Sequence, residues 1–409
     1  MNQFAPTAPR ASAADPAIAD EMVARAAALR PLLAERARQT EIDGRVSDDI
    51  TRMLAEAGIF ALGQPRSFGG TAQPPSVMVR VAFELGRGCG STAWCASIGA
   101  VNAWLASYWP IEAQREIWEN SPGNLVIGTF VPTGHCEPVE GGYRVRGRWP
   151  FGSNCDSANW MFVSATLPPS GDRPADVGWF MVPAAELAID HDSWRVSGMQ
   201  GTGSKTLFAG EPLFVPEHRV IRFSDVVKVS TPGRAIDGNT MAHFGFTTFG
   251  AATLVAPMLG MAQGALDWFV AAMAKKAKTS LKPGGAGLVA QSPFVQARVG
   301  AASAAIDSAM TLLLADLAPV EAKVLAGGTL EPAERIRIRR NIGFAAQQAV
   351  HAVNLLFEGA GGSATALDTP IQRFWRDINA AARHASLEVQ PIYALYGEER
   401  FGLPPVGQF

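Results

Sequence analysis

The sequence predicts an α+β protein in which a helical segment, a β-rich segment and a second helical segment follow one another. Three observations predict this order. Apolar residues recur at helical spacing near the start, short runs of β-branched and aromatic residues fill the middle, and long alanine-rich stretches follow. We expect a disordered tail over 1–16, a helical domain over 17–125, an antiparallel β domain over 126–227 and a four-helix bundle within 228–409.

The first domain begins with two predicted helices. Between Ile18 and Leu33 the apolar residues are spaced by four and three, which places them in one stripe on a helix. Ser47 precedes a second apolar run, as an N-cap residue does, and Gly58 follows that run, as a residue that ends a helix does.

The middle of the chain contains the runs "NLVIGTFVP", "YRVRGRWPF", "NWMFVSATL" and "VGWFMVP", which clusters of Gly, Pro, Asp and Asn separate. This alternation is typical of an antiparallel sheet. Farther on, "VQARVGAASAAIDSAMTLLLADLA" places its larger apolar residues on one helical face and small residues between them. Such helices pack closely in bundles.

One stretch, residues 249–274, is long and apolar enough to span a bilayer, with Asp267 as its only charge. Pro257 and Gln263 also interrupt it, and many of its residues are Ala or Gly. We therefore predict a buried core helix rather than a membrane span.

The composition argues against several functions. The net charge is −2 and no basic block occurs, so a nucleic-acid partner is not expected. The four cysteines, Cys89, Cys95, Cys136 and Cys155, form no C-x-x-C pair, so neither a zinc site nor a disulfide framework is expected. No secretory signal is visible, and we predict a cytoplasmic protein with reduced thiols and no membrane partner.

Common catalytic motifs are absent. The stretch "EGAGGSA" over 358–364 is glycine-rich but is not the G-x-G-x-x-G of a Rossmann dinucleotide site. The motifs G-x-S-x-G and H-E-x-x-H do not occur, which argues against an α/β-hydrolase and a zincin.

Two segments of the β domain carry polar residues in turns. In "GRWPFGSNCDSANW" (147–160), a turn could lay backbone N–H groups and a Ser hydroxyl against a flat heteroaromatic ring. In "WRVSGMQGTGSKTLFAGEPLFVP" (194–216), glycines permit close backbone approach and Thr202, Ser204 and Lys205 offer donors. An ordinary hairpin turn and a glycine-rich β connection explain the same residues.

The segment "QRFWRDINAAARHASL" (372–387) reads as an alanine-rich helix with a lone histidine, His384. On such a helix Asp377 and His384 share a face but lie roughly 10 Å apart along the axis, too far for direct contact. His384 would then face either a cofactor or, as a lone histidine often does, a structural partner.

Together these three segments resemble the acyl-CoA dehydrogenase fold. "GRWPFGS" is similar to that family's flavin-facing strand and turn, and "SGMQGTGSKTLFAGEPLFVP" to its second β motif. "FEGAGGSATALDTPIQRFWRD" resembles its Gly-Gly loop and the Arg-Asp helix that follows. The resemblance implies an N-terminal α domain, a middle β domain and a C-terminal four-helix bundle.

The chain departs from the dehydrogenases at their catalytic base. One common form places a Glu in a Glu-Gly-Thr motif after this helix, but here the sequence reads "RHASLEV" and Glu388 lies outside such a motif. "RFWRDINAAARHASL" and "GRGCGSTAWCASIGAVNAW" instead resemble the flavin-dependent monooxygenase branch. That branch contains the oxygenase components of two-component aromatic hydroxylases, such as p-hydroxyphenylacetate and secosteroid-phenol hydroxylases.

The resemblance implies catalytic roles for His384 and Ser153. In that branch reduced flavin reacts with O₂ to give a C4a-hydroperoxide, which survives only where water is excluded. Ser153 would hydrogen-bond at flavin N5. His384 would stabilise the peroxide oxygens or act as a base on a phenol or indole substrate.

The resemblance implies cofactor and substrate contacts as well. The expected cofactor contacts are Thr129, Ser153, Thr202, Ser204 and Lys205, with Gly361 and Gly362 reaching the cofactor of a neighbouring subunit. The expected substrate contacts are Trp94, Asn102, His243 and Phe246. At Asn102 we expect some relatives to carry a His.

The sequence thus predicts an oxygenase component that takes reduced FMN or FAD (FMNH₂ or FADH₂) from a separate NAD(P)H:flavin reductase. With O₂ and no metal it would hydroxylate an aromatic or heteroaromatic substrate of the phenol or indole type, as a homotetramer. Three alternatives remain: an acyl-CoA dehydrogenase with tightly bound FAD and a carboxylate such as Glu388 as base, an N- or S-oxygenase of the same fold, and a non-enzymatic binding protein.

Overall fold

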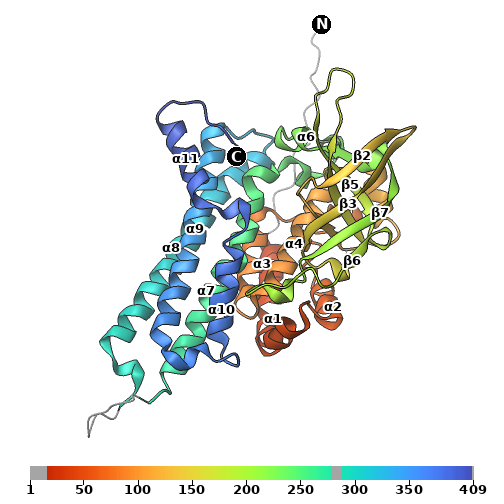
Figure 1. Ribbon diagram of the computed structural model, residues 1–409. Coiled ribbons are helices and arrows are strands. Elements are labelled where there is room, and N and C mark those ends of the chain that lie inside the picture. Colours follow the sequence, from red (N-terminus) through yellow and green to blue (C-terminus); the bar gives the residue numbers. More distant parts are fainter. Residues whose placement is uncertain (1–15, 278–286, 408–409) are drawn as a thin grey trace.

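The computed structural model describes residues 16–277 and 287–407, and the disordered tail predicted over 1–16 falls almost entirely outside them. The described chain passes from helices through a sheet to a helical bundle, in the predicted order (Figure 1). The N-terminal helices are α1 (Pro16–Asp43), α2 (Asp48–Glu56), α3 (Pro75–Gly86), α4 (Gly90–Ala106) and α5 (Ile111–Trp118).

The first two helices follow the sequence signals. Met22, Ala26 and Leu33 of α1 are buried, so the predicted apolar stripe faces the core. Helix α2 begins directly after Ser47, which is its N-cap residue. Gly58 follows α2 with a φ of 76°, a left-handed conformation that favours glycine.

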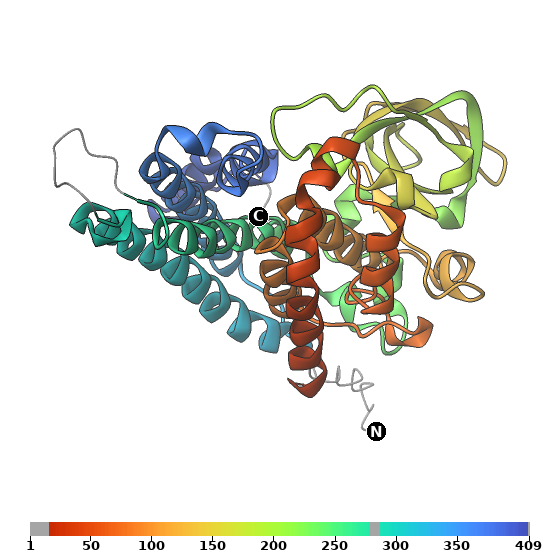
Figure 2. The same ribbon diagram turned by 90° about the horizontal axis from the view of Figure 1, so that it is seen from below.

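Helix α4 lies at the centre of the molecule. Every residue of this helix is buried except Ile98, because it contacts α3 and α7 as well as β1 and the short 3₁₀ helix η4 (Gln200–Thr202). Figures 1 and 2 show α3 and α4 between the helical bundle and the sheet. Side chains of α4 can therefore reach groups from both of the other domains.

The sheet has eight strands in the order β6-β7-β3-β2-β4-β5-β8, with β1 paired to β4. Most neighbours are antiparallel, but β4 runs parallel to β1 and β2, so the sheet is mixed. The reason is that β4 pairs with β2 rather than β3, and two reversals of the chain separate them. The strands are β1 (Val126–Gly128), β2 (Gly134–Val139), β3 (Gly142–Gly152), β4 (Trp160–Leu167), β5 (Asp176–Pro183), β6 (Ala188–Asp190), β7 (Lys205–Pro216) and β8 (Val220–Arg222).

A cluster of aromatic rings joins the sheet to the helices. Phe162 and Trp179 stack with ring centroids 5.1 Å apart, and Phe130 stacks on Phe246 at 5.3 Å. Trp109, which follows α4, lies 5.6 Å from Phe162. Such pairs contribute beyond their buried area, so the cluster fixes the sheet against the start of the bundle.

The C-terminal half forms the helical bundle, in which α7 is the central helix. Most residues of α7 are buried, which confirms the prediction of a core helix over 249–274. Gly86 and Gly260 let α3 and α7 approach closely, since a Cβ on Gly86 would meet the Pro257 carbonyl oxygen at 2.6 Å. The helices are α6 (Phe223–Val227), α7 (Phe246–Met273), α8 (Pro293–Leu325), α9 (Pro332–Ala360), α10 (Pro370–Ala381) and α11 (Val389–Arg400).

Within the part of the chain that the structure describes, two helices, α7 and α8, are long and apolar enough to cross a membrane by length and composition alone. The most apolar part of α7 is 94% buried in protein, as in the core of a folded domain. The corresponding part of α8 is 33% buried, so much of that helix is exposed in a single chain.

Candidate active site

Two turns of the β domain meet beside α4 and carry unusual backbone conformations. In the turn that ends β3, Phe151 and Asn154 have φ values of 68° and 60°. In the turn before β7, Met199 has a φ of 57°. The backbone N–H of Asn154 donates to the Thr202 carbonyl at 2.9 Å, which joins the two turns. Left-handed non-glycine residues are uncommon and gather at functional sites.

A chain of buried hydroxyls runs between these turns. The Oγ atoms of Ser153 and Ser204 lie 2.7 Å apart, and Ser204 Oγ lies 2.7 Å from Thr202 Oγ1. Thr202 Oγ1 in turn donates to the Met199 carbonyl at 2.8 Å. The structure therefore brings together three of the predicted cofactor contacts, which lie in two separate sequence segments.

The direction of this chain follows from its last bond. A hydroxyl has one proton, and that of Thr202 is committed to the Met199 carbonyl. With Thr202 donating to Met199, the two remaining bonds are both made when Ser204 donates to Thr202 and Ser153 donates to Ser204. Ser153 is left with unused lone pairs, so it presents an acceptor to any ligand beside it. Asn154 adds a buried amide donor, Nδ2, that has no partner among the described residues.

The predicted helix around His384 ends earlier than expected. Helix α10 stops at Ala381, and His384 has extended backbone angles and caps the short turn η10 (Ala385–Leu387). The expectation that Asp377 and His384 share one helical face was therefore wrong. Asp377 is buried and accepts a hydrogen bond from the Met199 N–H at 2.6 Å.

The imidazole of His384 is held in one tautomer. Its Nδ1 accepts a hydrogen bond from the Ser386 N–H at 3.2 Å, so the proton of the neutral ring is on Nε2. The ring is accessible to solvent, yet burial by surrounding protein and the nearby charge of Arg339 lower the pKa of His384. At neutral pH the ring is uncharged and offers one donor, Nε2–H.

Helix α4 connects the histidine to the hydroxyl chain. The ring of Trp94 lies 5.9 Å from the ring of His384, and the next residue, Cys95, directs its Sγ at the Thr202 carbonyl at 3.5 Å. Two of the predicted groups, a substrate contact and a catalytic residue, are therefore neighbours. The same helix reaches the predicted cofactor residues.

Asn102 lies on the same helix and is 1% exposed, but neither atom of its amide group has a partner among the described residues. Trp94, Ile98 and Asn102 are spaced by four residues and so share one face of α4. Ile98, between the other two, is the only residue of α4 that is not buried. This face is therefore partly accessible to solvent at Ile98, and one turn farther along it Asn102 holds a buried donor and a buried acceptor.

The other predicted substrate contacts lie near the aromatic cluster. Phe246, at the start of α7, stacks on Phe130 and lies 6.0 Å from Trp179, so it is part of the packing between domains. His243 is half-buried in η7 (Thr240–His243), and burial and the charge of Arg234 lower its pKa. The structure does not bring these two residues into contact with His384.

Lys205 and Thr129 are committed to protein partners. The Lys205 Nζ donates to both carboxylate oxygens of Asp156, at 2.7 and 2.6 Å, so its charge is balanced within the protein. Thr129 is buried at the end of β1, where its Oγ1 donates weakly to the Phe162 carbonyl at 3.4 Å. Because Asp156 already balances its charge, Lys205 is less available for a cofactor contact than the sequence predicted.

Gly361 and Gly362 lie where α9 ends, not with the hydroxyl chain. Gly361 has a φ of 80° and caps α9, and Lys276 Nζ donates to the neighbouring Ala360 carbonyl at 2.8 Å. Figure 1 shows the α9–α10 connection at the end of the bundle remote from the sheet.

Glu388 is exposed at the start of α11 and is not enclosed as a buried catalytic base would be.

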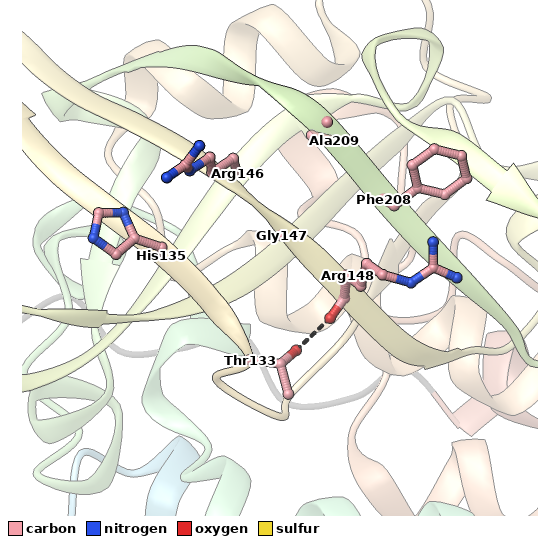
Figure 3. Close-up of a pocket in the computed structure, with 8 residues that line it drawn as sticks. Thr133, His135, Arg146, Gly147, Arg148, Phe208 and Ala209 are labelled. Carbon is pink, nitrogen blue, oxygen red and sulfur yellow. Dashed lines mark hydrogen bonds between the residues drawn. The ribbon is translucent and has the colours of Figure 1, made fainter.

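An open pocket of about 350 Å³ lies on the outer face of the sheet, over β2, β3 and β7 (Figure 3). Arg146 and His135 line it, and Thr133 Oγ1 donates to the Arg148 carbonyl at 2.6 Å. The Arg148 guanidinium lies 5.1 Å from the centroid of the Phe208 ring. None of the predicted site residues lines this pocket.

The four cysteines are buried and free, and no cluster of His, Cys, Asp or Glu that could hold a metal ion occurs within residues 16–277 and 287–407.

Comparison with known proteins places this site in a family. Residues 19–119 match the acyl-CoA dehydrogenase N-terminal domain, and residues 252–389 match the acyl-CoA dehydrogenase C-terminal domain. The chain is 35% identical to the flavin-dependent monooxygenase oxygenase subunit HsaA of Rhodococcus jostii (strain RHA1), over 92% of this chain and 97% of that protein. The chain is a flavin-dependent monooxygenase of the acyl-CoA dehydrogenase fold.

Other relatives of this monooxygenase agree. It is 34% identical to the FADH₂-dependent resorcinol hydroxylase oxygenase component of Rhizobium sp. (strain MTP-10005), over 95% of this chain and 96% of that one. Its structure matches the crystal structure of 3-HSA hydroxylase from Rhodococcus sp. RHA1 with a TM-score of 0.88, 34% identity and coverage of 95% and 98%. XiaF from Streptomyces sp., in complex with FADH₂, matches with a TM-score of 0.86, 27% identity and coverage of 96% and 98%.

The residues of this monooxygenase fit a flavin beside the two turns. A flavin edge carries N–H and C=O groups, which complement the acceptor on Ser153 and the unpaired Nδ2 of Asn154. Phe151 has a left-handed φ and is 61% exposed, and its ring, which meets that of Trp194 edge to face at 6.3 Å, leaves apolar surface for a flat ligand. Sequence reasoning assigned no role to Asn154 or Phe151, although both lie in the segment 147–160.

Arg339 is the other residue that sequence reasoning missed. It is buried on α9, and its Nη2 donates to the Ser386 carbonyl at 3.0 Å, which fixes the turn that carries His384. No local motif marks it, because its role depends on the packing of α9 against η10.

Proposed function

We propose that this monooxygenase is the oxygenase component of a two-component system and receives reduced FMN or FAD from a separate NAD(P)H:flavin reductase. When bound, the reduced flavin supplies the electrons that activate O₂ for transfer of one oxygen atom to an aromatic or heteroaromatic substrate. The names of HsaA as an oxygenase subunit and of resorcinol hydroxylase as an oxygenase component support a partner reductase. The absence of a Rossmann motif from the sequence is consistent with it.

The observation that carries this proposal is the direction of the hydroxyl chain. In the arrangement in which Thr202 donates to Met199, Ser153 donates to Ser204 and so presents an acceptor to the flavin. Reduced flavin has a proton on N5, whereas N5 of oxidised flavin is an acceptor. The site therefore matches the reduced form, and an oxidised flavin would place two acceptors face to face.

His384 acts as a hydrogen-bond donor in this proposal. Its Nδ1 is occupied by the Ser386 N–H, so Nε2–H is the group available to the reacting oxygen. A neutral donor stabilises developing negative charge without supplying a proton too early. Of the two roles that the sequence suggested, this geometry favours stabilisation over action as a base.

The substrate lies along the face of α4 that carries Trp94 and Asn102. Trp94 offers a flat apolar surface beside His384, and the unpaired amide of Asn102 offers a donor and an acceptor. We infer a planar aromatic substrate with at least one polar substituent, which pairs with Asn102 and places its ring near His384.

The alternatives differ in what they require of this site. An acyl-CoA dehydrogenase needs an enclosed carboxylate base, and Glu388 is exposed. N- or S-oxygenation needs the same flavin and donor as ring hydroxylation, so the product alone distinguishes those reactions.

The quaternary state and location are part of the proposal. The outer face of α8 is exposed and made largely of small residues, including Ala297, Gly300, Ala301 and Ala304, which suit close helix packing between subunits. We propose a cytoplasmic homotetramer in which Gly361 and Gly362 approach a neighbour's flavin.

The test starts with anaerobic titration of reduced and oxidised FMN and FAD. We expect reduced flavin to bind roughly tenfold more tightly or better, since a buried unpaired acceptor costs about 1–3 kcal/mol. The loaded protein is then mixed with ¹⁸O₂ and a panel of phenols and indoles, and products are analysed by mass spectrometry. Ring products that carry ¹⁸O support the proposal. Tight binding of oxidised FAD together with oxidation of acyl-CoA substrates contradicts it.

A further inference from the structure

A pocket of about 280 Å³ opens where α1, the α3–α4 connection, α7 and the start of α10 meet. The arginines Arg30, Arg87 and Arg373 lie in its walls, together with the flat rings of Trp268 and Phe374. None of the residues to which we assign flavin or substrate contacts lines this pocket.

Two of the three arginines are already paired. Arg87 donates to Asp267 Oδ2 from Nε and Nη2, at 3.2 and 2.9 Å, and from Nη1 to Glu84. Arg30 Nη1 donates to Glu84 Oε2 at 3.1 Å. Both carboxylates beside the pocket are therefore used by Arg30 and Arg87.

Arg373 differs from the other two because it is 7% exposed and has no hydrogen bond or ion pair within the described parts of the chain. Asp377, one turn farther along α10, attracts it at longer range but is itself bonded to the Met199 N–H. A guanidinium has five N–H donors, and those of Arg373 border the pocket without an acceptor from the described parts of the chain. An acceptor from outside the chain could bond to them.

The start of α10 favours the same kind of ligand. Pro370, the first residue of this 12-residue helix, lies in the pocket wall. The hydroxyl of the N-cap residue, Thr369, lies within hydrogen-bond distance of the Ala364 and Ala366 carbonyls, to which its single proton is directed, and it does not cap the helix. The start of the helix, which carries the positive end of its dipole, therefore lies in the wall of the pocket that Arg373 also lines.

We propose that this pocket binds a small carboxylate that carries a flat apolar group. The carboxylate pairs with the guanidinium fork of Arg373, and the flat group lies against Trp268 and Phe374. One negative charge fits best, because Arg30 and Arg87 are matched by Glu84 and Asp267 and only Arg373 is left over.

Benzoate is the probe for this site, and binding to the full-length protein without flavin is measured by calorimetry at constant ionic strength. We expect Arg373→Gln to weaken benzoate binding roughly ten- to a hundredfold, the range for loss of a charge-assisted pair. Arg373→Lys keeps the charge without the fork and should bind with intermediate affinity. Ala34→Trp, at an exposed position in the pocket wall, should block binding while Arg373 is intact.

Benzoate could also enter the candidate active site, so Asn102→Leu is the matched control. Benzoate affinity that falls in the Asn102 variant but not in the Arg373 variants contradicts the inference. Phosphate that binds as tightly as benzoate contradicts the carboxylate assignment. Because the readout is binding without flavin, failure here is distinguishable from failure of the proposed oxygenation. Circular dichroism verifies that each variant is folded.

Discussion

The hydroxyl oxygens of Ser153 and Ser204 lie 2.7 Å apart, and the direction of the bond between them is set by a third residue, Thr202. Because Thr202 donates to the Met199 carbonyl, each hydroxyl in the chain donates inward. This arrangement leaves Ser153, the side chain that we propose contacts the flavin, as an acceptor.

Replacing Thr202 with Val should reduce the preference for reduced flavin. Without the Thr202 hydroxyl, Ser204 can donate to Ser153, which then can donate to oxidised flavin. We expect the ratio of the two flavin affinities to fall by roughly tenfold, the value of one hydrogen bond. Anaerobic and aerobic titrations measure it. Thr253→Val is the control, since Thr253 is also buried and donates to a carbonyl, that of Gly250. An unchanged ratio in the Thr202 variant would refute the directional chain.

Replacing His384 with Ala should uncouple O₂ consumption from product formation. The donor at Nε2 is lost, and we expect product per O₂ to fall roughly ten- to a hundredfold while H₂O₂ rises. His384→Gln retains an N–H donor and should recover part of the coupling. Because burial and Arg339 lower the pKa of His384, coupling in the wild type should hold as pH falls below about 6.5, the usual histidine value. Equal coupling in all three proteins would exclude the donor role.

Asn102→Leu should leave the free protein as stable as the wild type or more stable. The amide of Asn102 has no partner to lose, and a buried unpaired amide costs about 1–3 kcal/mol. The KM for the substrate should rise roughly tenfold, with a smaller change in kcat. Gln114→Leu is the contrast, since Gln114 is equally buried but donates to the carbonyls of Ser107 and Trp109. Chemical denaturation of both variants measures the difference, and a destabilised Asn102 variant would show that a partner exists.

Glu321→Gln should change how stability depends on pH. Glu321 of α8 accepts from the Ser76 N–H at 2.6 Å, and burial raises its pKa to about 7. Because the folded-state pKa lies above the unfolded value of 4.5, the folded protein binds more protons between these pH values. Stability should therefore fall as pH rises from about 4.5 to about 7, by up to roughly 3 kcal/mol. The variant, which cannot ionise, should lack this component in denaturation curves recorded across that range. If the stabilities of the two proteins changed with pH in the same way, the assignment of this pH dependence to Glu321 would be contradicted.

Much of the architecture could be predicted because it depends on local patterns. Helical spacing marked α1 and α2, and the alternation of β-rich runs with turn residues marked the sheet. The parallel pairing of β4 with β2 could not be predicted, because strand order is decided by which edges meet. The end of α10 before His384 was also missed, because the alanines continue the helical pattern up to and past Ala381, where the helix ends.

The sequence by itself determined the order of helices and strands, the family resemblance and the residue types at the candidate site. Tertiary structure decided which of those residues meet. It paired Ser153 with Ser204, placed Trp94 beside His384 and committed Lys205 to Asp156. The physical reason is that propensity and periodicity act over a few residues, whereas the donor and acceptor state of a buried group depends on partners that only folding brings within 3 Å.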